Sequence, residues 1–153
     1  MTNSPFEMAL DEIIKGLLAE TKLTLHPDSF TIGSIDRSGE DKARGIITDL
    51  APFASLTFDV AEVSLVATAE DWVGLRERFE EYREEGPFRL ITFDIVLDLS
   101  IVGFMAVVSR RLADDGVSIF ALSTYLRDHI LVKEGDCGKA VKALGSLISE
   151  SRQ

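Results

Sequence analysis

The segment Leu112-Ala-Asp-Asp-Gly-Val-Ser-Ile-Phe120 joins the end of a helix to the start of a strand. The apolar residues before it recur at helical spacing and predict one face of that helix: Ile101, Phe104, Met105, Val108 and Leu112. Gly116 ends the helix, because glycine adopts the left-handed conformation without steric cost. The apolar run that follows predicts a strand over 117–125.

The elements on either side of this segment complete a regular pattern. A strand is expected over 88–97, and Ser100 is the expected cap of the helix that follows. A short turn, Leu126-Arg127, separates strand 117–125 from a second strand over 128–133. A last helix carries the apolar stripe Cys137, Ala140, Val141, Leu144, Leu147 and Ile148. The second half therefore reads β-α-β-β-α.

The first half is less regular. Ser4-Pro5-Phe6-Glu7 predicts the start of a helix that ends near Glu20, since Ser4 and Glu7 have the spacing of a capping box. The sequence also predicts short strands on either side of His26-Pro27-Asp28, and a polar loop over 36–44. The segment 45–50 is ambiguous. A hairpin is expected from two strands, over 55–60 and 62–67.

A second amphipathic helix is expected after Thr68, which is placed to cap it with Asp71 three residues on. Its buried stripe would comprise Trp72, Leu75, Phe79 and Tyr82. The glutamates at 80, 81, 84 and 85 would form its solvated face, and Gly86-Pro87 would end it.

The two halves thus share a weak repeat of about half the chain. The pattern predicts an α+β fold built from two tandem ferredoxin-like βαββαβ units, with antiparallel sheets and helices on one face. We expect an N-terminal helix over 1–21, a first, atypical unit over 22–87 and a second unit over 88–153. Each unit lacks one clear strand: either strand 88–97 serves both halves, or the two sheets exchange strands.

Composition limits the functional class. The chain has 153 residues and a formal net charge of −10, from 16 basic and 26 acidic residues. Nucleic-acid binding needs a basic surface, so it is not expected. The most apolar window, 90–109, is interrupted by Asp94 and Asp98, and no membrane span or secretory signal is expected. Together with the single cysteine, Cys137, this favours a cytoplasmic protein.

The sequence lacks the usual signatures of catalysis. His26 and His129 do not have the spacing of a metal site, and Cys137 falls on an apolar stripe. Asp114-Asp115 lies at a helix end, where it is typical of helix termination rather than acid–base chemistry. We therefore expect no catalytic residues, no metal and no cofactor.

Four segments resemble an ACT domain: Phe88-Arg-Leu-Ile-Thr-Phe-Asp94, Asp98-Leu-Ser-Ile-Val-Gly-Phe104, Leu112 to Phe120, and Asp128-His-Ile-Leu-Val132. The chain is most similar to small tandem ACT proteins related to the regulatory region of aspartate kinases, over about residues 15–149. The resemblance implies a non-catalytic regulatory module that binds a small amino acid or related metabolite and forms a homodimer. The turn Leu126-Arg127 departs from the family, which tends to carry a His or Thr beside the Asp.

The resemblance places the ligand at a loop and a strand: Asp98, Leu99, Ser100, Ile101, Val102 and Gly103 in the loop, and Val117, Ser118 and Ile119 in the strand. The residue types fit a ligand, since a helix N-terminus attracts a carboxylate and Asp98 would pair with an α-amino group. Each residue also has a structural interpretation: Ser100 as a helix cap, Gly103 as a packing contact, and Asp98 as a surface residue. Two other functions stay open, an interaction module that keeps the fold without ligand, and a small acyl-phosphate hydrolase.

Overall fold

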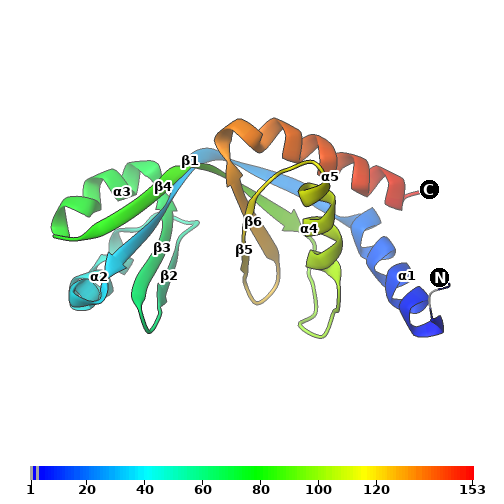
Figure 1. The fold of residues 1–153 in the computed structure, drawn as a ribbon, viewed down its shortest axis with the longest axis horizontal. Helices are drawn as coiled ribbons and strands as arrows, with labels where there is room; N and C mark the ends of the chain where they lie inside the picture. The colour runs from blue at the N-terminus through cyan, green and yellow to red at the C-terminus, as the bar shows by residue number, and fades with distance from the viewer. Residues whose placement is uncertain (1, 3) are drawn as a thin grey trace. The chain divides into compact units, whose positions relative to one another are not determined.

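The computed structural model describes residue 2 and residues 4–153. Its strands follow the order β2-β3-β1-β4-β6-β5 in an antiparallel sheet accompanied by helices (Figure 1). The chain divides into two units: unit 1 holds the residues up to His26 together with Leu90–Gln153, and unit 2 holds Pro27–Arg89. The predicted α+β fold with ferredoxin-like units is confirmed.

Unit 2 follows the βαββαβ order along the chain. Its elements are β1 (Lys22–Asp36), α2 (Glu40–Gly45), β2 (Ser55–Phe58), β3 (Glu62–Thr68), α3 (Ala69–Leu75) and β4 (Tyr82–Asp94). The predicted hairpin is present, with Ser55 paired to Val66 across β2 and β3. Trp72 and Leu75 pack into a core with Ile35, Val63 and Phe79.

Unit 1 has the same strand order but takes its strands from both ends of the chain. It contains the second part of β4, α4 (Phe104–Asp114), β5 (Ile119–Ser123), β6 (Asp128–Lys133) and α5 (Cys137–Ser151). Its remaining strand is the beginning of β1, which follows α1 (Pro5–Glu20). Strands β1 and β4 therefore run in both units.

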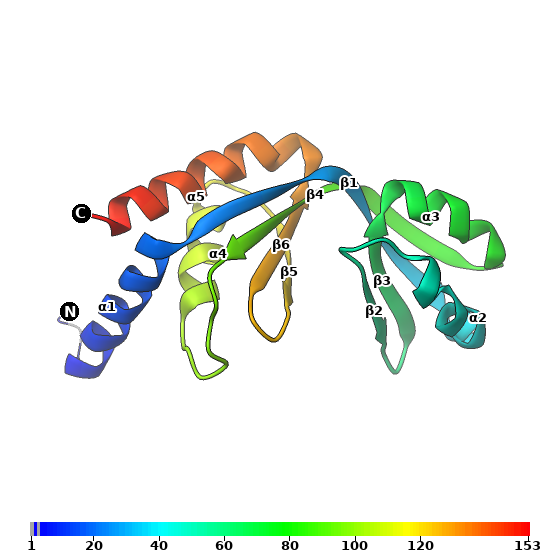
Figure 2. The ribbon, with the colours of Figure 1, turned by 180° about the vertical axis from the view of Figure 1, so that it is seen from behind.

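The core of unit 1 lies between its sheet and three helices. Ile91 and Phe93 on β4 and Ile130 on β6 pack against α4, α5 and α1. The C-terminal ends of α1 and α5 lie side by side (Figure 2), where Arg152 Nε donates to the carbonyl of Ala19 at 2.9 Å. The capping box of α1 is confirmed, since Ser4 and Glu7 accept each other's backbone N–H.

Two predictions for the first half are wrong. Strand β1 is unbroken through His26-Pro27-Asp28, and its pairing with β3 begins only at Phe30. Pro27 therefore lies where β1 has no β3 partner, and proline is tolerated at such edge positions. The expected loop over 36–44 instead contains a 3₁₀ turn, η1 (Arg37–Gly39), and α2. Asp36 initiates the turn by accepting the N–H of Ser38 at 2.9 Å.

The prediction of a long helix after Thr68 is also wrong. Thr68 caps α3 as predicted, by accepting the N–H of Asp71, but α3 ends at Leu75 and β4 begins at Tyr82. The ring of Trp72 meets the ring of Tyr82 edge-on, with centroids 5.4 Å apart. Trp72 Nε1 also donates to Glu84. The apparent helical spacing thus comes from a contact between a helix and a strand.

Candidate functional site

The loop between β4 and α4 is folded around Asp98. One oxygen of its carboxylate, Oδ1, accepts the backbone N–H of Ser100 at 2.8 Å and the Ser100 hydroxyl at 2.5 Å. These two hydrogen bonds lower the pKa of Asp98 below its ordinary value, so the carboxylate is charged at neutral pH. Ser100 is thereby held in a turn, and the prediction that it caps α4 is wrong.

Helix α4 begins at Phe104, and Gly103 occupies the cap position with a φ of 97°. This left-handed conformation breaks the helical path between Ser100 and Phe104, and it favours glycine strongly. The helix N-terminus therefore lies at residues 103–106, later in the chain than expected. Its unpaired N–H groups still attract negative charge.

A cavity of about 290 Å³ lies beside this N-terminus, entirely within unit 1. The first wall of the cavity comes from the β4–α4 loop and the first turn of α4, with Leu97, Asp98, Leu99, Ile101, Gly103, Phe104, Met105 and Ala106. The second wall comes from the end of β5, the turn and the start of β6, with Ser123, Thr124, Arg127 and Asp128. Its volume is close to the lower limit of ligand pockets, about 300 Å³.

The second wall carries charge of both signs. Arg127 Nε donates to Asp94 Oδ1 at 2.9 Å, which fixes the guanidinium plane. Asp128 Oδ1 accepts the hydroxyl of Ser123 at 2.7 Å. One cation and two carboxylates, those of Asp98 and Asp128, thus line the same cavity.

A chain of polar side chains leads from the cavity wall into the sheet. The hydroxyl of Thr124 donates to the carbonyl of Arg127 at 3.1 Å, so at its contact with His129 Nε2, 3.2 Å away, the Thr124 oxygen accepts the hydrogen bond. The hydroxyl of Thr92 lies 2.8 Å from Nδ1 of His129 and 2.9 Å from Nε2 of His26, so it is hydrogen-bonded between the two imidazole rings.

The surroundings of His129 favour its neutral form. Only 7% of its surface is exposed, and burial lowers its pKa below the ordinary value. The charges of His26 and Arg127 act in the same direction, and Asp128 opposes them.

The described part of the chain offers no candidate metal site. Among residue 2 and residues 4–153, no group of three or more His, Cys, Asp and Glu side chains could hold a metal ion. Cys137 is buried in the core of unit 1. None of the helices in these residues is long and apolar enough to cross a membrane.

Comparison with known families finds one match. The family model of the ACT domain matches residues 84–146. The ACT match includes both walls of the cavity and all nine predicted ligand residues. No curated protein matches the chain.

The solved structures that are similar share the fold at low sequence identity. A Vibrio cholerae protein of unknown function, described as a possible transport protein, aligns with a TM-score of 0.69 and 22% identity over 91% of this chain and 98% of that one. A protein from Agrobacterium tumefaciens aligns with a TM-score of 0.66 and 23% identity over 84% of this chain and 89% of that one. The ligand-free regulatory subunit of aspartate kinase from Thermus thermophilus aligns with a TM-score of 0.61 and 14% identity over 83% of this chain and 97% of that one. Over 83% of its length the chain therefore shares the fold of the aspartate kinase regulatory subunit.

The cavity in unit 1 brings together only some of the nine predicted ligand residues. Asp98, Leu99, Ile101 and Gly103 line the cavity, whereas Ser100 and Val102 lie in the same loop outside the lining. The strand residues are also not in the lining: Val117 is buried in the core, Ser118 is exposed and Ile119 is half-buried.

Arg127, Asp128, Ser123 and Thr124 were not among the predicted ligand residues. The sequence did contain a signal for them, because the Leu126-Arg127 turn departs from the ACT pattern directly before Asp128.

Proposed function

We propose that unit 1 is a non-catalytic regulatory module that binds a small amino acid or a related metabolite in the cavity between the β4–α4 loop and the β5–β6 turn. One observation carries the proposal: a single cavity at a helix N-terminus is lined by Arg127, Asp98 and Asp128. The ACT match over 84–146 and the fold shared with aspartate kinase regulatory subunits support the regulatory role.

The charges suit a zwitterion. The planar guanidinium of Arg127 accommodates a carboxylate in two parallel hydrogen bonds, and Nε already points to Asp94. An α-ammonium group would lie toward Asp98 and Asp128, where two carboxylates offset its charge. The exposed apolar side chains at the same loop and turn, Leu99 (72%), Val102 (62%) and Tyr125 (78%), are available to an apolar ligand side chain or a partner surface.

Those exposed side chains also favour the second candidate, an interaction module that keeps the fold without ligand. The two functions differ in one measurable respect. A ligand-binding module binds a free small molecule in the absence of a partner protein, and an interaction module does not.

Calorimetry of the purified protein against the twenty amino acids at millimolar concentration tests the proposal. We expect at least one to bind, and Arg127→Gln to weaken that binding about 10- to 100-fold, since a charged hydrogen-bonding group contributes roughly 1.5–3 kcal/mol. Arg110→Gln is the matched control, because Arg110 pairs with Asp114 on the exposed surface of α4, away from the cavity lining.

The control should bind as the wild type does. Absence of binding for all twenty amino acids would contradict the proposal and favour the interaction module. Equal binding by the wild type and Arg127→Gln would place the ligand elsewhere.

A further inference from the structure

Unit 2 repeats the topology of unit 1, so the cavity has a topological counterpart there. In unit 1 the cavity lies between the connection from β4 to α4 and the turn from β5 to β6. The corresponding parts of unit 2 are the connection from β1 to α2, formed by η1, and the turn at residues 59–61 between β2 and β3. The connection in unit 2 is only three residues long, Arg37–Gly39.

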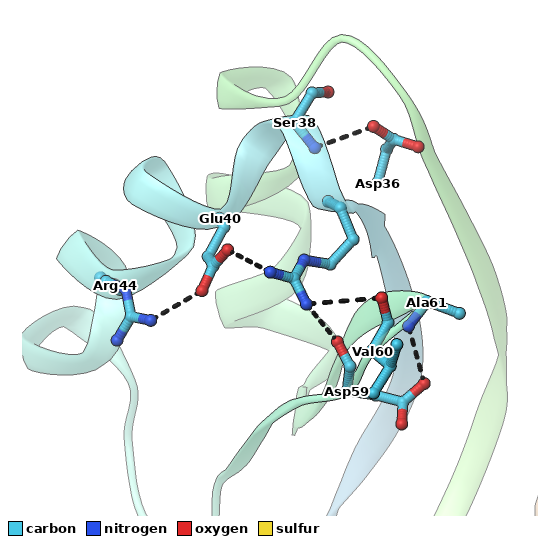
Figure 3. A network of polar contacts seen from close by, with 8 residues as sticks. Asp36, Ser38, Glu40, Arg44, Asp59, Val60 and Ala61 are labelled. Atoms are coloured by element: carbon cyan, nitrogen blue, oxygen red, sulfur yellow. Dashed lines mark hydrogen bonds and ion pairs between the residues drawn. The ribbon is translucent and has the colours of Figure 1, made fainter.

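One side chain bridges these parts of unit 2. Arg37 Nη1 donates to the carbonyl of Asp59 at 2.6 Å and to that of Val60 at 3.5 Å (Figure 3). Arg37 Nη2 donates to Glu40 Oε2 at 2.7 Å. The guanidinium therefore lies between the turn and the first residue of α2, as a ligand of the unit 1 cavity would lie between its two walls.

The surroundings of Arg37 are those of a cation site. Two turn carbonyls and one carboxylate accept its protons, and the second oxygen of Glu40 accepts from Arg44 Nη2 at 2.7 Å. Arg44 also lies 4.2 Å above the ring of Phe58 at the end of β2. Both arginines thus hold the hairpin and the start of α2 together.

We propose that Arg37 is a built-in occupant of the unit 2 counterpart of the ligand cavity, so that this position in unit 2 is closed to a free ligand. The expectation that an amino acid binds in unit 1 and not at this turn of unit 2 rests on the proposed function. The occupancy of unit 2 by Arg37 does not, because it depends only on contacts within unit 2.

Removing the occupant tests the inference. In Arg37→Ala, ethylguanidinium should bind in the millimolar range, shift the backbone amide signals of residues 59–61 saturably, and raise the unfolding temperature toward that of the wild type. The wild type should bind it at least tenfold more weakly at this turn. The control is Arg78→Ala, which removes another exposed ion pair of unit 2, with Asp49, away from the turn.

Absence of saturable shifts in Arg37→Ala, or equal shifts in the wild type or in Arg78→Ala, would overturn the inference. If Arg37→Ala does not fold, Arg37→Gln carries the same test, because it keeps a long polar side chain without the charge. Titration of the wild type with amino acids separates the two proposals: saturable shifts of the amide signals of residues 59–61 would overturn this inference, whereas no amino-acid binding would overturn only the proposed function.

Discussion

At the scale of single residues, Gly103 determines where α4 begins. Its φ of 97° is a conformation that costs other L-residues about 1–2 kcal/mol. A Cβ at this position would meet only Ile14 Cγ1, at the ordinary distance of 4.0 Å. The cost of a side chain here therefore comes from the backbone and not from crowding.

We predict that Gly103→Ala lowers the free energy of unfolding by about 1–2 kcal/mol, for this backbone reason. Gly145→Ala is the matched substitution, because Gly145 is exposed in the middle of α5 and a Cβ there meets nothing within 4 Å. It should raise the free energy of unfolding by roughly 0.5–1 kcal/mol. Urea denaturation measures both, and a loss of stability in both variants would contradict the argument.

His129 makes the stability of unit 1 dependent on pH. Burial lowers its pKa in the folded protein, whereas the unfolded chain has the ordinary value of about 6.5. Between these two values the unfolded chain binds the proton more readily, so the free energy of unfolding falls as the pH drops below about 6.5. Above that pH the neutral imidazole is the main form in both states, and His129 contributes no slope.

We predict that the wild type loses stability relative to His129→Gln as the pH decreases from 7 to 5.5, by at most about 1.4 kcal/mol per pH unit for one proton. Denaturant unfolding at a series of pH values measures the difference, in which the titration of the shared carboxylates cancels. Parallel curves for the two proteins would mean that His129 titrates equally in both states.

At the scale of elements, the local sequence pattern correctly predicted the helix caps and strands that are stabilised by contacts between neighbouring residues. The capping box of α1, the Thr68 cap and the bounds of β6 needed only neighbouring residues. The predictions failed where a distant partner decides the structure. Tyr82 has the spacing of a helix stripe with Trp72, but it belongs to β4, whose neighbour β1 lies far away in the sequence.

The candidate site shows the same division. The loop residues Asp98, Leu99, Ile101 and Gly103 follow one another in the sequence, and the predicted helix start pointed to them. Arg127 reaches the cavity only because β5 and β6 form a hairpin, with Ser123 paired to Asp128. Its position relative to the loop depends on β4 and β6 being neighbours, and strand order is not encoded in local periodicity.

At the scale of the whole molecule, the two units differ in how the chain supplies their strands. Unit 2 takes its four strands in the order in which they occur along the chain. Unit 1 completes its sheet with the beginning of β1, and α1 packs on its core through Ile14 and Leu18. No continuous segment from the second half of the chain therefore contains all of unit 1.

We predict that residues 82–153 alone do not unfold cooperatively, whereas the same segment followed by a linker and residues 4–29 does. A Gly/Ser linker of about 15 residues is long enough, since α1 with its 16 residues spans about 24 Å. Thermal melting followed by circular dichroism measures the cooperativity of unfolding, and sedimentation verifies that both proteins are monomers. Residues 27–94, which hold the strands of unit 2 in order, serve as the control, with Trp72 as a fluorescent reporter.

An equally cooperative transition in the linear and the permuted protein would show that unit 1 does not need α1 and the start of β1.

The position of α1 also has a consequence for biosynthesis. Within this chain α1 leaves the ribosome before every other element, yet its packing partner α5 is the last to be made, and Arg152 contacts Ala19 across 133 positions. The strands of unit 2 are complete once β4 has emerged, so this unit is free to fold while translation continues. Ile14 and Leu18 lack their α5 partners until the C-terminal helix is made, so the core of unit 1 is completed only at the end of synthesis of this chain.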